Sequence, residues 1–370
     1  MPSTDASWET LESLFTSSHG NFDEILGYSN GIKYLKLRTI SKGDRIKQFA
    51  RTHQIQGYSQ LRVNDLLEKI FTDATENDIE DFIKETFVQE RDIDIGQEDE
   101  LYEHLSKVTT VDWGGVRNNR LERSLVDNYV KRIKNYDEIK EKLSSEVNET
   151  VEGWLLSNWY SFWSNKIIEN LIKDHSRVLP GIGDIKHIDF FWDNIPFDLK
   201  TTKFARGFID FKRQEMGIGK EVQALKRFAR DNNIDFDNNN GDEQIKTDLI
   251  LKFSESNEEQ HKNFVKEQIY DIRKNLLDAT IADPEEYAIW NYENQGEDRF
   301  GDENRFFLIL VDKNTTEESW KLKRERGFIT QKINEFLDRG AEAHLMRNLS
   351  FTFDRRNFVA NCCILFILEE

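Results

Sequence analysis

The chain of 370 residues contains little cysteine and no long apolar run. Its two cysteines, Cys362 and Cys363, are adjacent and lie inside an apolar run, which predicts a buried strand rather than a disulfide or a zinc site. No stretch approaches the roughly 20 apolar residues of a membrane-spanning helix, so we expect no membrane partner. Residues 1–7 lack the basic and apolar regions of a signal peptide, so we expect a cytoplasmic protein.

Sequence motifs of several enzyme classes are also missing. The chain has no P-loop and no G-x-S-x-G, which argues against an NTP-driven motor and against an α/β-hydrolase. The seven histidines show no metal-ligand spacing. Apolar residues make up 38% of the chain, which is enough for a substantial core, and the length allows two or three domains.

An excess of positive charge is lacking as well, since the net charge is −18. This value argues against nonspecific coating of nucleic acid, but the field near a site matters more than the total. The charges are segregated along the chain. Residues 31–62 hold eight Lys or Arg and one acid, a balance of +7, whereas residues 63–103 hold fifteen acids and three bases, a balance of −12. We interpret the acidic segment as a helix with a solvated face.

The pattern of residues 41–71 predicts a helix, an extended loop and a second helix. Ile46 and Phe49 belong to the apolar stripe of the first helix, Gly57 marks the loop, and Asn64 is a candidate N-cap of the second helix. This order resembles the small SAP-like and Rho-N-terminal-like modules, which bind nucleic acid in many of their hosts. The resemblance implies that five basic side chains face phosphates: Lys42, Arg45, Lys47, Arg51 and Arg62. The alternative is a helical hairpin with a solvated basic face, because such modules also serve as protein contacts.

Two short strands joined by a turn are predicted over residues 186–203. The first strand carries Asp189. The second carries Asp198 and Lys200, which share a face because side chains alternate along a strand. The pair Asp193-Asn194 between the strands suits a tight hairpin turn. An acid of one strand is therefore expected beside an acid and a lysine of its neighbour, as in a divalent-metal site.

A densely apolar helix is predicted over residues 149–175, and its apolar density indicates a buried helix. Glu169 lies among these apolar residues, and a carboxylate on a buried helix needs a partner. Two interpretations of Glu169 remain open. It forms an ordinary salt bridge with Lys166 or Lys173, or it points at the site predicted about twenty positions later.

Buried strands are predicted over residues 305–312 and 358–368, with a helix over residues 317–338 between them. The predicted fold class is α/β (α+β), with a mixed sheet flanked by helices. We expect a helical N-terminal region in residues 1–110, a connector helix in residues 111–148, and the sheet-containing core in residues 149–370.

This order of elements resembles the PD-(D/E)XK nuclease superfamily, which has the restriction-endonuclease-like fold. Asp189 stands where the superfamily places its first strand acid, and Asp198 and Lys200 match its (D/E)XK half. Glu169 matches the acid often found on the preceding helix. Ile188 replaces the usual proline before the first acid, which lowers the specificity of the motif, and the short interval between the two acids demands a tight hairpin.

The resemblance implies a Mg²⁺-dependent endonuclease that hydrolyses phosphodiester bonds in double-stranded DNA, of the type II-like restriction class. Asp189, Asp198, Glu169 and the backbone carbonyl of Leu199 are the implied metal ligands, because Mg²⁺ prefers hard oxygen ligands, and Mn²⁺ is the expected substitute. Lys200 would position or deprotonate the attacking water, or neutralise charge in the transition state.

Two further basic residues, Lys203 and Arg206, follow the motif and are expected to contact phosphates. Enzymes of this type often dimerise to cut both strands, so a homodimer is compatible with the resemblance, although the sequence identifies no dimer surface. Two alternative functions stay open: a noncatalytic nucleic-acid-binding or interaction protein on the same fold, and a structure-selective repair or RNA nuclease. Two other D-x-K triplets, at residues 184–186 and 210–212, are weaker candidates than residues 198–200.

Overall fold

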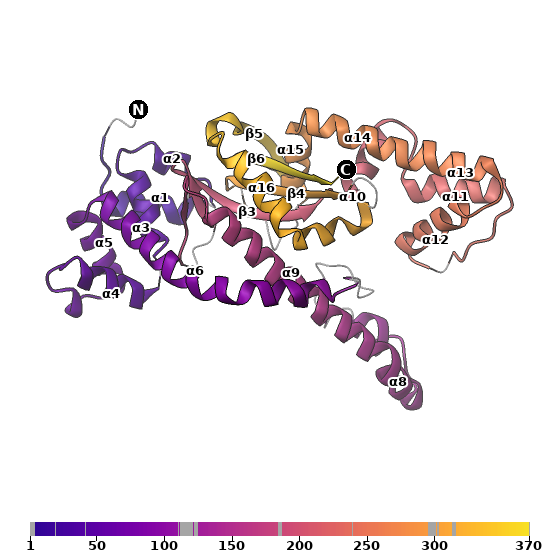
Figure 1. Cartoon of the computed structure of the whole chain (residues 1–370), viewed down its shortest axis with the longest axis horizontal. Coiled ribbons are helices and arrows are strands. Elements are labelled where there is room, and N and C mark those ends of the chain that lie inside the picture. Colours follow the sequence, from indigo (N-terminus) through magenta and orange to yellow (C-terminus); the bar gives the residue numbers. More distant parts are fainter. Residues whose placement is uncertain are drawn as a thin grey trace. The chain divides into compact units, whose positions relative to one another are not determined.

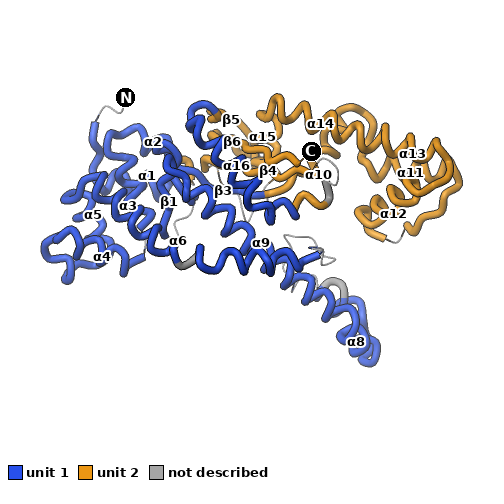
Figure 2. Tube along the Cα trace, in the orientation of Figure 1, with its two compact units in different colours: residues 1–17, 22–201, 321–343 blue, residues 18–21, 202–320, 344–370 orange. Residues whose placement is uncertain are grey.

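The computed structural model describes residues 4–18, 20–40, 42–109, 111, 121, 125–183, 187–238, 240–294, 301, 303–312 and 316–369 (Figure 1). The chain divides into two compact units (Figure 2). Unit 1 comprises residues 1–17, 22–201 and 321–343, and unit 2 comprises residues 18–21, 202–320 and 344–370. The described residues contain helices together with strands in antiparallel and in parallel pairs, so the predicted mixed α/β class is confirmed.

Unit 1 is mainly helical. Its helices are α1 (Trp8–Ser17), α2 (Asp23–Leu26), α3 (Gly31–Arg38), α4 (Gly43–Thr52), α5 (Val63–Asp73), α6 (Glu76–Ser106), α8 (Tyr136–Lys142), α9 (Asn148–Lys173) and α16 (Arg326–Leu337). Short 3₁₀ or π segments are η1 (Tyr58–Gln60), η2 (Val126–Val130), η3 (Leu143–Val147), the second part of η6 (Thr316–Arg324) and η7 (Ala341–Ala343). Its strands are β1 (Val178–Pro180), β2 (Phe190–Trp192) and β3 (Ile195–Lys203), whose last two residues are counted with unit 2.

The expected helix, loop and helix of residues 41–71 are confirmed as α4, η1 and α5. Ile46 and Phe49 are buried, and Gly57 has the left-handed φ of 73° that a glycine adopts without strain. The predicted N-cap was wrong. Helix α5 begins at Val63, so Asn64 already lies within its first turn, and no side chain caps this end.

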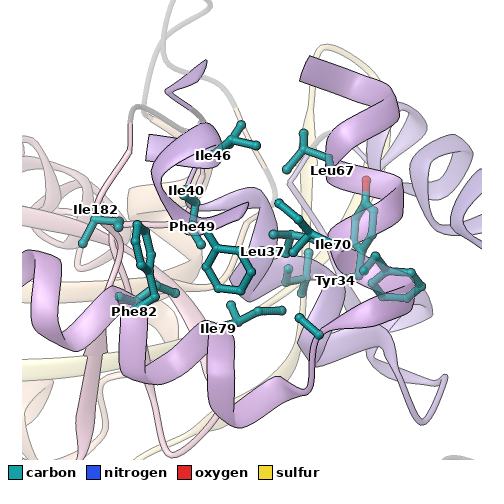
Figure 3. Close-up of a cluster of buried hydrophobic side chains, with 14 of the residues drawn as sticks. Tyr34, Leu37, Ile40, Ile46, Phe49, Leu67, Ile70, Ile79, Phe82 and Ile182 are labelled. Atoms are coloured by element: carbon teal, nitrogen blue, oxygen red, sulfur yellow. The ribbon is translucent and has the colours of Figure 1, made fainter. Parts of the chain in front are cut away.

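One hydrophobic core joins the N-terminal helices to the strands of unit 1 (Figure 3). Tyr34 of α3, Phe49 of α4 and Phe82 of α6 are buried in it, and so is Ile182, which follows β1. Phe191 of β2 belongs to the same cluster. The basic N-terminal segment and the hairpin that carries the candidate acids therefore share one hydrophobic core.

The predicted helix over residues 149–175 is confirmed as α9, but its burial was overestimated. Its last ten residues are anchored in the core through Ile167, Ile168 and Leu171. The part before them exposes Leu155, Leu156, Trp159, Phe162 and Trp163. The apolar density of a helix shows how much surface it can bury, whereas burial also requires a neighbouring element to cover that surface.

Part of the predicted connector helix, at residues 112–120 and 122–124, lies outside the described residues. The described remainder is divided into η2, α8 and η3 rather than forming one continuous helix. The Asn135 side chain accepts hydrogen bonds from the backbone N–H groups of Asp137 and Glu138 and so begins α8.

Strands β1, β2 and β3 form an antiparallel group in unit 1. Trp192 pairs with Ile195, so β2 and β3 are joined by the two residues Asp193 and Asn194. Their φ angles of 49° and 67° are those of a type I′ turn, which confirms the predicted hairpin. Strand β2 begins at Phe190, so the prediction that Asp189 lies on this strand was wrong: Asp189 immediately precedes it. His187, which we also expected in the strand, has a φ of 73° that no strand residue adopts.

Unit 2 contains a mixed three-stranded group flanked by helices. Its helices are α10 (Arg206–Glu215), α11 (Glu221–Asp231), α12 (Asp242–Ser254), α13 (Glu259–Val265), the π segment η4 (Lys266–Tyr270), α14 (Asp271–Ala282) and α15 (Glu285–Glu293). Strand β4 (Arg305–Asp312) pairs in parallel with β6 (Arg356–Glu369), which pairs antiparallel with β5 (Met346–Phe353). Phe208 of α10, Leu277 of α14 and Tyr287 of α15 pack against these strands.

The two buried strands predicted near the C-terminus are confirmed as β4 and β6, and both cysteines are buried in β6. Strand β5 was not predicted. The helix predicted over residues 317–338 is interrupted, because η6 ends at Arg324 and α16 begins at Arg326.

Candidate active site

Asp189 is held by three hydrogen bonds immediately before β2. Its backbone N–H donates to the carbonyl oxygen of Phe197 at 2.8 Å, and its own carbonyl accepts from the N–H of Gly181 at 2.8 Å. Its Oδ2 accepts from the backbone N–H of Leu199 at 2.7 Å. Leu199 is the middle residue of Asp198-Leu199-Lys200, so the first acid is fixed directly beside the D-x-K triplet.

The environment of Asp189 disfavours its ionised form. Burial raises the pKa of Asp189 to about 6, and the negative charge of Asp198 acts in the same direction. The hydrogen bond from Leu199 opposes this rise, Glu169 adds to it, and Lys173 opposes it. Three side chains and one backbone N–H therefore act on this carboxyl group, which places Asp189, Asp198 and Glu169 in one neighbourhood.

Asp198 and Lys200 form an ion pair, with Lys200 Nζ at 2.6 Å from Asp198 Oδ2. This contact confirms that the two side chains share a face of β3. The Asp198 side chain is only 13% exposed, whereas the Lys200 side chain is 42% exposed. Lys200 can therefore reach solvent and a bound substrate while it remains next to a largely buried carboxylate.

Glu169 is paired with Lys173 one turn further along α9, at 2.5 Å. Lys173 is buried and also donates to the carbonyl oxygen of Gly181 at 3.0 Å. The salt-bridge interpretation of Glu169 is thus realised with Lys173 rather than Lys166. The second interpretation stays a prediction, although the charge of Glu169 contributes to the raised pKa of Asp189.

The carboxylates only partly fit the expected metal centre. Within the described residues, no three side chains of His, Cys, Asp or Glu are arranged to hold a metal ion together. Mg²⁺ commonly keeps several waters and is bound through one or two carboxylates plus substrate phosphates. Asp189 and Asp198 match this smaller donor set, whereas Glu169 is engaged with Lys173.

Two of the predicted nucleic-acid-binding residues lie beside this site. Lys42 and Arg45 line the same cavity as Glu169 and Lys173, with a volume of about 430 Å³. This cavity, formed entirely by unit 1, connects the N-terminal basic segment to the acid of α9. It was not foreseeable from the sequence, because its walls come from segments more than 100 residues apart.

The other predicted phosphate contacts are placed differently. Lys47 and Arg51 are exposed, one turn apart on α4, and Arg62 is exposed in an ion pair with Asp65. Lys203 and Arg206 belong to unit 2, where Arg206 pairs with Glu243 at 2.5 Å.

The three D-x-K triplets differ in their structural context. Residues 184–186 lie outside the described residues. Asp210 and Lys212 lie on helix α10, where residues two positions apart do not share a face, and Lys212 pairs with Glu286 at 2.8 Å. Only the triplet at residues 198–200 lies on a strand beside a second acid, among those the structure describes.

Two residues near the acids were not singled out as site residues. Lys173 links Glu169 to Gly181, and its spacing of four residues from Glu169 on a predicted helix was the available signal. Gly181 approaches the backbone of Asp189 so closely that a Cβ atom there would lie 2.8 Å from the Asp189 carbonyl oxygen. No local sequence pattern indicates that contact.

No match is found for this chain among models of protein families, curated proteins or solved structures. The functional argument therefore rests on the geometry of the site. In the described part of the chain, no helix has both the length and the apolar character needed to span a bilayer.

Proposed function

We propose that the protein is a Mg²⁺-dependent endonuclease that hydrolyses phosphodiester bonds in double-stranded DNA, with type II-like restriction as its biological role. The observation that carries the proposal is the hydrogen bond from the Leu199 N–H to Asp189 Oδ2. It brings the acid immediately before β2 to the Asp-Leu-Lys triplet of β3, an arrangement close to the one expected of a PD-(D/E)XK nuclease, in which the first acid lies on the strand itself.

Asp189 and Asp198 would hold the divalent cation, with Mn²⁺ as a substitute for Mg²⁺. When bound there, the cation would lower the pKa of a coordinated water and stabilise the negative charge that develops on the phosphate. Burial is the main cause of the raised pKa of Asp189, and the charges of Asp198 and Glu169 add to it; a bound cation would balance these negative charges. The carbonyl of Leu199 remains a third candidate ligand.

Lys200 would act on the reacting water and phosphate. Its ammonium group has three N–H donors, and the ion pair with Asp198 uses only part of this capacity. Held at the acid and exposed to solvent, it can orient the attacking water or neutralise charge on the phosphate oxygens in the transition state.

Glu169 and Lys173 would act at the edge of the same site. Glu169 would orient a water next to Asp189 rather than bind the cation directly, because Lys173 occupies one of its oxygens. Lys173 would hold Glu169 and the Gly181 carbonyl at fixed positions, and so would act as a positioning residue.

The test is cleavage of supercoiled plasmid with Mg²⁺, for the wild type and for Asp198→Ala and Lys200→Ala. We expect loss of cleavage in both variants with unchanged circular dichroism. Lys212→Ala is the matched control, because it removes the lysine of a D-x-K triplet that lies on a helix. Normal cleavage by Asp198→Ala and Lys200→Ala would refute the proposed site.

A noncatalytic nucleic-acid-binding protein is the second candidate. It is favoured by the pairing of Glu169 with Lys173 and by the lack, among the described side chains, of three acids in metal-binding geometry. Tight binding of DNA, with no cleavage of duplex, branched or single-stranded substrates under Mg²⁺ or Mn²⁺, would establish it.

A further inference from the structure

A cavity of about 430 Å³ adjoins Glu169 within unit 1. Its walls come from the start of α4, the middle of α6, the second half of α9 and residues 181–183 after β1. Pockets that hold a single small ligand have volumes of about 300–1,000 Å³, so the cavity has the size for one nucleotide. A DNA duplex cannot enter it, since a volume of about 430 Å³ holds only a single small ligand.

The cavity is lined by more positive than negative side chains. Its five cations are Lys42, Arg45, Arg91, Lys166 and Lys173, and its two acids are Glu90 and Glu169. Their sum of +5 and −2 leaves a formal charge of +3 on the walls, in a protein whose net charge is −18. An anionic ligand is therefore favoured at this place.

Most of these cations are already engaged. Arg45 pairs with Glu90, Arg91 pairs with Asp174 and Glu98, and Lys173 pairs with Glu169. Lys166 is half-buried and makes no ion pair within the part of the chain that the structure describes. Its ammonium group is thus available to a phosphate at the cavity wall.

One wall of the cavity is aromatic. Phe87 of α6 lines the cavity, is half-buried, and packs against the hydrophobic core of unit 1. A ring supported from behind in this way offers a face on which a nucleobase can stack, and such stacking tolerates any base.

We propose that this cavity binds a single unpaired nucleotide of a nucleic-acid strand, with the phosphate on Lys166 and the base on Phe87. This inference rests on the proposed nuclease function for its substrate class, because Glu169 belongs to both the cavity and the candidate active site. The preferred substrate is then a duplex with an unpaired nucleotide beside the scissile bond, rather than an uninterrupted duplex.

The test is fluorescence anisotropy in EDTA, where no cleavage occurs. The probes are a fluorescein-labelled blunt duplex and the same duplex with one unpaired thymidine. We expect the wild type to bind the second probe about tenfold more tightly, a ratio in the range of stacking one base on an aromatic ring. Phe87→Leu should abolish this preference, and Phe87→Tyr should retain it.

Lys166→Met should weaken binding of the unpaired probe several-fold. The matched control Lys84→Met changes an exposed lysine of α6 outside the cavity and should have no effect. Equal affinity of the wild type for both probes would overturn the inference, and so would an undiminished preference in Phe87→Leu. Loss of the preference in the presence of millimolar inorganic phosphate, with Phe87→Leu behaving as the wild type, would show a free-phosphate site and would also overturn it.

This experiment is independent of catalysis. A preference for the unpaired probe without any plasmid cleavage in Mg²⁺ would support the cavity assignment while refuting the nuclease. Plasmid cleavage without any preference for the unpaired probe would support the nuclease and refute the cavity assignment.

Discussion

The backbone N–H of Leu199 lies 2.7 Å from Oδ2 of Asp189 and donates a hydrogen bond to it. The position of this carboxylate is therefore set by the backbone of the neighbouring strand, ten residues further along the chain. A backbone donor cannot be removed by changing the side chain of Leu199. The contact between the first acid and the D-x-K triplet is consequently built into the pairing of β2 with β3.

Asp189→Asn is expected to stabilise the protein at neutral pH. The folded-state pKa of about 6 lies above the ordinary value of 3.8, so the fold disfavours the ionised carboxylate. This cost is fully present above about pH 6 and vanishes as the pH falls below 3.8. A shift of this size corresponds to about 3 kcal/mol. Urea unfolding at about pH 7.5 should show the gain, and the gain should disappear near pH 4.

Asp193→Asn is the control for this prediction, and we expect it to change the stability in the opposite direction. Burial raises the pKa of Asp193, but hydrogen bonds from Arg177 and Ala341 outweigh it and leave the pKa lowered. Asparagine tolerates the positive φ of this turn position. Asp193→Asn should therefore destabilise at neutral pH, and the loss should shrink as the pH falls below 3.8. Equal effects of both substitutions at both pH values would contradict the electrostatic assignment.

Mg²⁺ should raise the melting temperature of the wild type without any DNA present. A ligand that binds only the folded state stabilises it by about 2.7 kcal/mol at a hundred times its Kd. The effect should be absent in Asp189→Asn and smaller at low pH, because protons compete for the carboxylates. Differential scanning fluorimetry with MgCl₂, and with NaCl at equal ionic strength, measures it. The same rise in Asp189→Asn as in the wild type would place the cation elsewhere.

Lys36→Met is expected to destabilise unit 1 by about 2–4 kcal/mol, because it leaves the partners of a buried charge unpaired. Lys36 is fully buried, and its Nζ lies 2.5 Å from Glu76, 2.6 Å from Glu80 and 2.6 Å from Asn194. It thus links α3 and α6 to the turn between β2 and β3.

The control is Lys84→Met, which removes the other cation of Glu80. The Lys84 side chain is 54% exposed, at 3.3 Å from Glu80, so its loss should change the stability by less than about 1 kcal/mol. Unfolding in urea compares the two variants. A Lys36→Met variant as stable as Lys84→Met would show that the link to the hairpin turn contributes little.

Gly181→Ala should destabilise the protein by about 1–3 kcal/mol and lower cleavage, because the new Cβ would meet the Asp189 carbonyl oxygen at 2.8 Å. Relieving this clash has to move the backbone that carries the Asp189 carboxylate. Gly327→Ala in α16 meets nothing within 4 Å and should be neutral or stabilising. Thermal melts and plasmid cleavage of both variants test the difference. Wild-type cleavage by a stable Gly181→Ala would show that the close contact is not needed.

The local elements of the candidate site were predictable from the sequence. The helix, loop and helix of residues 43–73 follow from apolar spacing, and the hairpin follows from two strand patterns around Asp193 and Asn194. The shared face of Asp198 and Lys200 follows from the alternation of side chains along a strand. Where the prediction failed, as in the burial of α9 and the missing strand β5, the outcome depended on distant partners.

The sequence by itself determined which residues form the hairpin and which of its side chains lie on one face, because side chains alternate between the two faces of a strand with a period of two residues. Only the tertiary structure decided that Glu169 pairs with Lys173, that Asp189 accepts from Leu199, and that Lys42 shares a cavity with Glu169. The reason is physical. Glu169 has more than one lysine within reach along its helix, so spacing alone does not select Lys173. The contact of Asp189 with Leu199 and the cavity shared by Lys42 and Glu169 join separate segments, and no periodic pattern in the sequence indicates such contacts.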